Sequence, residues 1–125
     1  MGMSLSRRQR GDIGEKLARQ HLQRLGYKIL ETNLRSREGE IDIIAQDKEE
    51  LVFVEVRTRA SDEFGTPEES VTPAKKEKLI SLALAYLQTH PHLPSLWRID
   101  VVAVELDREG KASRIELIQN AISAP

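Results

Sequence analysis

The sequence contains no cysteine, and this absence excludes several kinds of chemistry at once. Disulfide bonds, thiolate metal ligands and a cysteine nucleophile are all ruled out, so any bound metal ion must be held by oxygen or imidazole groups. The chain also lacks an apolar run of the roughly 20 residues needed to cross a bilayer, and no charged start leads into an apolar signal core. We therefore expect a cytoplasmic protein without a membrane partner.

Neither sign of charge is in large excess. Lys and Arg number 19 and Asp and Glu number 20, which gives a formal net charge of -1. Binding of nucleic acid by bulk electrostatics is therefore excluded, and such a partner would need local basic patches. Short basic clusters occur at Arg7, Arg8 and Arg10, at Arg35 and Arg37, at Arg57 and Arg59, and at Lys75, Lys76 and Lys78. In a chain with 31% charged residues, any one cluster is more often a solvated face than a binding surface.

With 125 residues, 39% of them hydrophobic, the chain can form one core, and we predict a single domain over residues 1–125. Apolar spacing predicts a helix over residues 10–25 and a second helix that is capped by Thr72 and ends before Pro91. Strands are predicted over residues 27–34, 40–45, 51–58, 97–106 and 113–118, and residues 60–69 are predicted to form a mobile loop. The order αβββαββ indicates an α/β fold in which helices flank a mixed sheet.

The strand predicted over residues 51–58 carries charge in an apolar setting. Because side chains alternate along a strand, Glu55 and Arg57 share one face with Leu51 and Phe53, while three valines occupy the other face. Both faces are largely apolar, as is typical of a central strand that is covered on both sides. A carboxylate and a guanidinium in such a strand are costly unless they have partners or a function.

A second carboxylate is predicted to face Glu55. If the hairpin loop is centred between residues 48 and 49, Asp47 pairs with Glu50. The same register, continued outward, places Asp42 opposite Glu55. Directly opposed like charges destabilise a sheet, above all when they are buried, unless a cation lies between them. A hard divalent ion such as Mg²⁺ or Mn²⁺ meets that need.

Glu15 is a third candidate ligand. It falls at the border of the apolar stripe of the first helix, so its carboxylate can lean towards the sheet. Gly11 and Gly14 lie beside it and would let that helix approach the sheet closely.

Structural roles for the same residues stay open. Glu55 and Arg57 could form an ion pair near the end of the strand, and Asp42 could accept hydrogen bonds from the turn at residues 37–39. Asp100, set among apolar neighbours, is expected to pair with an arginine. The opposed register of Asp42 and Glu55, with a cation two residues further on, favours a metal site.

Asp42, followed by Glu55, Val56 and Arg57, resembles the PD-(D/E)xK signature of restriction-endonuclease-like nucleases, written here as Ile-Asp and Glu-Val-Arg. Longer segments, in the same order along nearly the full chain, are similar to the YraN-like family of uncharacterised bacterial proteins. These segments are residues 11–15, 39–45, 51–57, 64–65 and 98–102. The expected fold of that family is similar to that of archaeal Holliday-junction resolvases.

The resemblance implies a restriction-endonuclease-like fold in which three carboxylates and one backbone carbonyl bind Mg²⁺ or Mn²⁺. The implied metal ligands are Glu15, Asp42, Glu55 and the carbonyl of Val56. The motif has a lysine where this chain has Arg57, and that lysine helps to orient the attacking water and neutralises charge on the phosphate. Arginine keeps the charge and binds phosphate in a forked geometry, but it cannot give up its proton. Charge stabilisation can therefore persist while the positioning of water is weakened.

The leading hypothesis is a metal-dependent nuclease that hydrolyses DNA phosphodiester bonds, at branched or damaged structures. Its catalytic residues are expected to be Glu15, Asp42, Glu55 and Arg57, and its phosphate contacts Arg7, Arg8, Arg57, Arg59, Lys75 and Lys76. A resolvase-like activity implies a symmetric homodimer, because two matched cuts need two sites. The alternatives are a nucleic-acid-binding module that has the nuclease fold without turnover, and a structural or adaptor protein whose carboxylates serve only the fold.

Overall fold

A computed structural model describes residues 5–122 and arranges five strands into one sheet. In order across the sheet, the strands are β1 (Lys28–Ser36), β2 (Gly39–Asp47), β3 (Glu50–Ala60), β4 (Leu96–Leu106) and β5 (Ala112–Ile122). Neighbouring strands are antiparallel except β3 and β4, which are parallel because α2 (Pro73–Thr89) carries the chain back between them. Another helix, α1 (Arg7–Arg24), precedes β1, and a short 3-10 helix, η1 (Glu68–Ser70), lies between β3 and α2. The predicted mixed α/β fold is confirmed.

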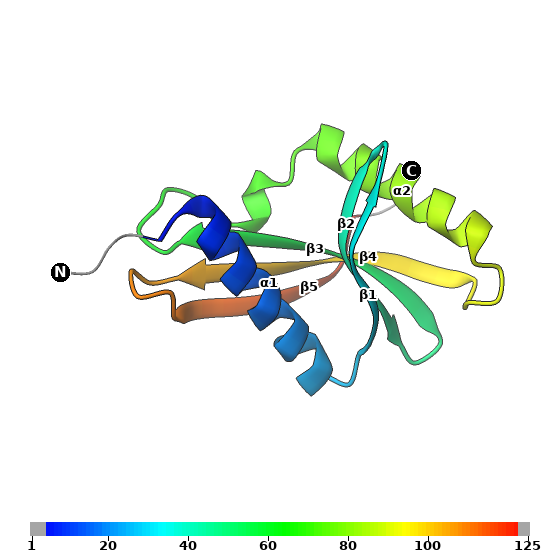
Figure 1. Ribbon diagram of the computed structural model, residues 1–125, viewed down its shortest axis with the longest axis horizontal. Helices are drawn as coiled ribbons and strands as arrows, with labels where there is room; N and C mark the ends of the chain where they lie inside the picture. The colour runs from blue at the N-terminus through cyan, green and yellow to red at the C-terminus, as the bar shows by residue number, and fades with distance from the viewer. Residues whose placement is uncertain (1–4, 123–125) are drawn as a thin grey trace.

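The helices α1 and α2 cover opposite faces of a strongly twisted sheet (Figure 1). The valines of β3 at positions 52 and 54 pack in the apolar cluster under α1, together with Ala18 and Leu22 of that helix. Leu51 and Phe53 pack in the cluster under α2. The central strand β3 is therefore buried on both faces, as its apolar pattern predicted.

Both α-helices begin at side-chain caps. Ser6 Oγ accepts a hydrogen bond from the Gln9 N–H, and the Gln9 side chain accepts one from the Ser6 N–H. At α2, Thr72 Oγ1 accepts a hydrogen bond from the Lys75 N–H, which confirms the predicted cap. Because α1 starts at Arg7 rather than at the predicted residue 10, the arginines of this segment lie in its first turn. Within residues 5–122 no helix is both long enough and apolar enough to cross a membrane.

Residues 60–69, predicted to be a mobile loop, are bonded to the sheet at both ends. The Ser61 N–H donates to the Leu106 carbonyl at 2.8 Å, and η1 is held by a 2.7 Å ion pair between Arg114 and Glu68. The hydrogen bonds of Arg114 lower the pKa of Glu68 to about 2. The loop therefore has fixed end points on β4 and β5.

Asp100 is fully buried in β4 and pairs with an arginine, as predicted. Arg98 Nε lies 3.0 Å from its Oδ1, the Tyr27 hydroxyl donates to its Oδ2 at 3.2 Å, and the Asn120 N–H donates to its Oδ1 at 2.9 Å. Arg98 also reaches Asp47 at 3.0 Å. These bonds satisfy the buried carboxylate of Asp100 and connect β4 to β5, so Asp100 has a structural role.

The approach of α1 to β3 depends on one glycine. A Cβ atom on Gly14 would overlap with the side chain of Thr58, whereas a Cβ atom on Gly11 would meet nothing within 4 Å. Of the two glycines expected to allow close packing, only Gly14 lies at the contact. This contact fixes the position of α1 above the end of β3.

Gly14→Ala should therefore lower the free energy of unfolding by about 1–3 kcal/mol, because overpacking outweighs the gain in helix propensity. Gly11→Ala, in the same helix but in open space, should raise it by about 0.5–1 kcal/mol. Urea unfolding followed by circular dichroism measures both values. Equal effects of the two substitutions would contradict the close contact at Gly14.

Candidate functional site

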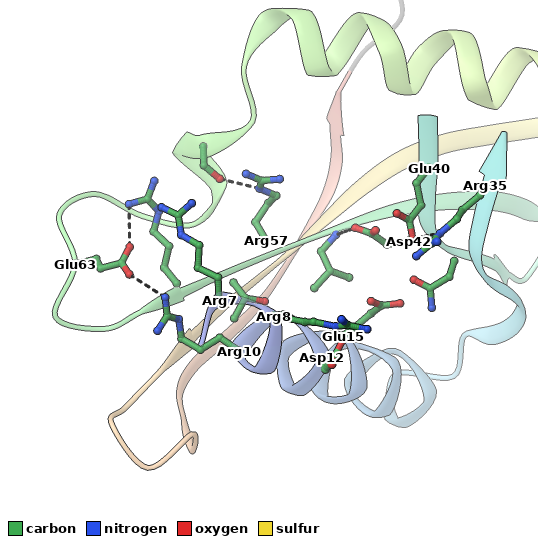
Figure 2. Close-up of a pocket in the computed structure, with 16 residues that line it drawn as sticks. Arg7, Arg8, Arg10, Asp12, Glu15, Arg35, Glu40, Asp42, Arg57 and Glu63 are labelled. Atoms are coloured by element: carbon green, nitrogen blue, oxygen red, sulfur yellow. Dashed lines mark hydrogen bonds and ion pairs between the residues drawn. The ribbon is translucent and has the colours of Figure 1, made fainter. Parts of the chain in front are cut away.

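A cleft of about 840 Å³ lies between the first half of α1, the outer ends of β1, β2 and β3, and the loop after β3. Figure 2 shows Asp42 and Glu40 at one end of this cleft and Glu63 at the other. Its carboxylate end contains Glu15, Glu40 and Asp42, with Arg35 3.8 Å from Glu40, and its arginine end contains Arg7, Arg10, Arg57 and Arg59 around Glu63. Carboxylates thus dominate one end of the cleft and arginines the other, while Arg8 is drawn beside Glu15 (Figure 2).

The hairpin between β2 and β3 has the predicted register. Asp47 pairs with Glu50, and pairing continues outward to Ile43 and Val54. Asp42 lies one position beyond this ladder, and its Oδ2 accepts a 2.8 Å hydrogen bond from the Val56 N–H. The predicted strand pair of Asp42 and Glu55 is therefore replaced by a bond from the β3 backbone to the Asp42 side chain.

The pleat of β2 is irregular next to Asp42. Ile41 and Ile44 both pack in the cluster under α2, although residues three apart normally lie on opposite faces of a strand. Across this break in β1 lies Asn33, whose φ of 52° is in the left-handed region that asparagine tolerates better than most residues. Asn33 lies within the strand predicted over residues 27–34, and it lines the cleft with Asp42 and Glu15.

Glu55 is 2% exposed and is not among the residues that line the cleft. Its Oε2 lies 3.2 Å from Lys75 Nζ and 3.6 Å from Arg57 NH1. The structural alternative of an ion pair between Glu55 and Arg57 is thus present, and the shorter contact comes from α2. Two cations offset the cost of burying this carboxylate in the sheet.

Burial raises the pKa of Asp42 to about 7, and the adjacent carboxyl group of Glu55 contributes to this rise. The Val56 N–H and the charge of Lys75 act in the opposite direction. Burial is also the main cause that raises the pKa of Glu15, and the charge of Asp42 is the second. A hydrogen bond from the Asn33 side chain lowers this pKa. Glu55 therefore raises the pKa of Asp42, and Asp42 in turn raises that of Glu15.

The donor set at the carboxylate end fits a hard divalent ion. Glu15 Oε1 is buried and has no hydrogen-bond partner among the described residues, and the buried Glu55 Oε2 has only its ion pairs with Lys75 and Arg57. Carboxylate oxygens in this state are ligands that Mg²⁺ or Mn²⁺ would satisfy. Within residues 5–122, however, no three His, Cys, Asp or Glu side chains converge closely enough to surround one ion. The protein therefore offers carboxylate ligands here without a complete cage.

The arginines at the other end of the cleft are held to different degrees. Arg57 Nε donates to Ser70 Oγ of η1 at 2.8 Å, as the dashed line in Figure 2 shows. Glu63 lies between Arg10 and Arg59, at 3.7 Å and 3.5 Å. Within the described chain, the side chains of Arg7 and Arg8 form no ion pair or hydrogen bond. Both are exposed.

Most of the predicted site residues meet in the cleft, and three do not. The cleft brings together Glu15, Asp42, Val56, Arg57, Arg7, Arg8 and Arg59. It does not include Glu55, Lys75 or Lys76, although Lys75 contacts Glu55. Sequence reasoning missed Asn33, Glu40, Glu63 and Ser70. Only Asn33 carried a signal, because asparagine within a predicted strand suggests an irregular backbone.

Comparison with known proteins places these residues in a family. The family model described as uncharacterised protein family UPF0102 matches residues 14–104. The chain belongs to this family. It is 48% identical over 122 residues to a UPF0102 protein of Dehalococcoides mccartyi, an alignment that covers 96% of this chain and 98% of that protein. It is also 49% identical over 119 residues to a UPF0102 protein of Moorella thermoacetica, with 95% and 99% covered.

The family match confirms the YraN-like resemblance of the motif segments. The match covers Glu15, Asp42, Glu55, Arg57 and Lys75, but it does not reach Arg7 or Arg8. The names of the relatives state no activity. The restriction-endonuclease-like assignment and the similarity to resolvases remain predictions.

The raised pKa of Asp42 predicts a pH-dependent stability. Without metal, the folded protein holds a proton on Asp42 that the unfolded chain releases, so this group lowers stability as pH rises from its ordinary pKa of 3.8 to about 7. Asp42→Asn keeps an acceptor for the Val56 N–H and removes the titration. As pH rises from 5 to 8, the unfolding free energy of the variant minus that of the wild type should therefore increase by roughly 1–3 kcal/mol.

Urea unfolding in EDTA at several pH values measures this difference. Asp12→Asn, at an exposed position of α1, is the control for loss of a negative charge. If the unfolding free energies of the wild type and Asp42→Asn depend on pH in the same way, the pKa of Asp42 is not raised in the folded protein.

Proposed function

We propose that the protein is a metal-dependent nuclease with a restriction-endonuclease-like fold that hydrolyses DNA phosphodiester bonds. The observation that supports this proposal is a cleft in which Asp42, a buried carboxylate with a raised pKa, shares a surface with arginines from α1 and β3. A phosphodiester brings both a negative charge for the arginines and an electrophilic phosphorus for attack by water. Carboxylates alone would repel such a substrate, so the arrangement requires a cation at the carboxylate end.

Asp42, Glu55 and Glu15 would hold the ion, and the carbonyl of Val56 would add an oxygen. When bound, Mg²⁺ or Mn²⁺ supplies charge neutralisation at the phosphate and lowers the pKa of a coordinated water. The Val56 N–H orients Asp42, because its 2.8 Å hydrogen bond fixes one carboxylate oxygen. The raised pKa of Asp42 makes the site empty of metal at low pH, where the proton occupies the ligand.

Arg57 and Lys75 would together replace the single lysine of the motif, which orients the attacking water and neutralises charge on the phosphate. Ser70 holds Arg57 Nε, so the terminal nitrogens of the guanidinium are left for Glu55 and for a phosphate. Lys75 Nζ lies 3.2 Å from Glu55 and supplies the ammonium group that position 57 lacks. An ammonium there can neutralise charge and donate to a water molecule, which arginine does less well.

The start of α1 is the proposed track for neighbouring phosphates. Arg7 and Arg8 lie in its first turn, where the helix dipole is already positive and basic residues are unfavourable. A partner with negative charge offsets this cost, and phosphate is such a partner. Arg59 of β3 lines the same cleft, and Lys75 and Lys76 of α2, which lie outside it, are the remaining proposed phosphate contacts.

Branched or damaged DNA is the proposed substrate. A junction substrate would require a homodimer, since two matched cuts need two active sites. Light scattering of the protein with and without a four-way junction measures this stoichiometry.

The decisive experiment is cleavage of labelled four-way junction, flap, single-stranded and linear duplex DNA with Mg²⁺ or Mn²⁺. We expect cutting that EDTA abolishes and that Asp42→Asn reduces by at least roughly 100-fold. Circular dichroism of the variant checks that it is folded. Cutting that persists in Asp42→Asn would contradict the assigned site and would point to a contaminating nuclease.

Lys75→Met should reduce cleavage by roughly 10²-fold, because it removes the ammonium nearest to Glu55. Lys78→Met is a matched control, since Lys78 is also exposed on α2 and forms no ion pair among the described residues. The rate at saturating DNA separates this effect from weaker binding. If both substitutions reduce the rate equally, Lys75 contributes only general positive charge.

A second candidate function is a nucleic-acid-binding module without turnover. The observation that favours it is the absence of a converged set of three ligands within residues 5–122, together with Arg57 at the lysine position. This module would bind DNA in a salt-dependent manner and would not cut it. Cleavage gained by Arg57→Lys would then indicate that the rest of the site is intact.

A further inference from the structure

Phe64, in the loop between β3 and η1, is 99% exposed, more than the exposed leucines Leu25, Leu84 and Leu96. A single exposed apolar side chain is ordinary on a protein surface. Phe64 differs from the exposed leucines because its backbone carbonyl accepts a hydrogen bond from Arg59, which lines the cleft. Its exposed ring is therefore available to a ligand bound at the cleft.

The backbone that carries Phe64 is bonded to the end of β3. Arg59 NH1 donates to the Phe64 carbonyl at 2.9 Å and lies 3.5 Å from Glu63 Oε2. The Glu63 N–H donates to the Ala60 carbonyl at 3.0 Å. Gly65 follows with φ +81°, a conformation that side chains rarely adopt. The ring is thus presented from a constrained turn, and little further ordering is needed when it binds a partner.

The position of Phe64 relates it to the arginine end of the cleft. Its neighbour Glu63 lines the cleft and contacts Arg10 and Arg59, as Figure 2 shows for Glu63. The Phe64 backbone therefore lies beside the cleft surface that also contains Arg7 and Arg57, because its carbonyl is bonded to Arg59. An exposed aromatic ring beside several arginines can stack on a base while the arginines contact its phosphates.

We propose that Phe64 stacks on an unpaired nucleobase of a nucleic acid whose phosphates lie along the arginine end of the cleft. This inference rests on the proposed function and specifies its substrate class. Bases inside a duplex are already stacked on both faces, so only a flap, a gap, a junction arm or an end offers a free face. Phe64 thereby selects interrupted over continuous duplex DNA.

Equilibrium binding with Ca²⁺ in place of Mg²⁺ or Mn²⁺ tests this inference with an oxygen-binding cation present, and gel analysis checks that the probes stay intact. The probes are a duplex with a single-stranded flap and a blunt duplex of the same length, each with a fluorescein label. Phe64→Ala should weaken flap binding by about tenfold and blunt-duplex binding by less than about twofold. Phe64→Trp should restore flap binding, and Phe64→Leu should not, because leucine is apolar but has no π face. Leu96→Ala is the matched control for loss of an exposed apolar side chain.

A 2-aminopurine in the flap gives a second readout, because stacking on an aromatic ring quenches its fluorescence. We expect quenching with the wild type and with Phe64→Trp, and none with Phe64→Ala. Equal flap affinities of the wild type, Phe64→Ala and Phe64→Leu would overturn the inference and leave the proposed function standing. If the wild type binds neither probe, the proposed function fails as well. If Phe64→Ala instead dissociates a homodimer and weakens both probes equally, the ring contacts a second copy of the chain, which also overturns the inference.

Discussion

The buried carboxylate of Glu55 is the constraint on which the site depends. It lies in β3, the central strand that both helices cover, and it is 2% exposed. A charge in such a place needs compensation, which comes from Lys75 on α2 and Arg57 on β3. The neighbouring Asp42 is held close by the Val56 N–H, and its pKa is raised as a result of burial and of Glu55. Near neutral pH Asp42 can hold a proton, and under the proposed function this pair of carboxylates would hold a metal cation instead.

The remainder of the fold determines what can reach these carboxylates. Gly14 allows α1 to lie against Thr58, and this contact places the start of the helix beside the cleft. The first turn of α1 is basic, which is unfavourable for an isolated helix and favourable for one that meets an anion. The loop after β3, bonded to β4 and β5, carries Glu63 to the opposite end of the cleft, next to Phe64 in the chain. The concentration of arginines at one end of the cleft thus depends on the packing of α1 on the sheet.

The apolar patterns of the sequence predicted the strands, the central position of β3 and the hairpin register, because periodicity records burial directly. They also located Asp42, Glu55 and the Thr72 cap. They could not locate Lys75 against Glu55, since this contact joins an exposed helix position to a buried strand and depends on how α2 packs. Nor could they predict that Asn33 adopts a left-handed φ within β1, or that Ser70 holds Arg57, because both depend on tertiary contacts rather than on local pattern.

The central claim is that these carboxylates bind a divalent cation, and calorimetric titration with Mn²⁺ tests it most directly. Titration at pH 7 in two buffers of different ionisation enthalpy measures both metal affinity and proton release. The account predicts binding with release of a proton by the wild type, a smaller release at pH 8.5, and loss of binding in Asp42→Asn. Binding by Asp42→Asn with the affinity of the wild type, or no binding by the wild type, would contradict the account.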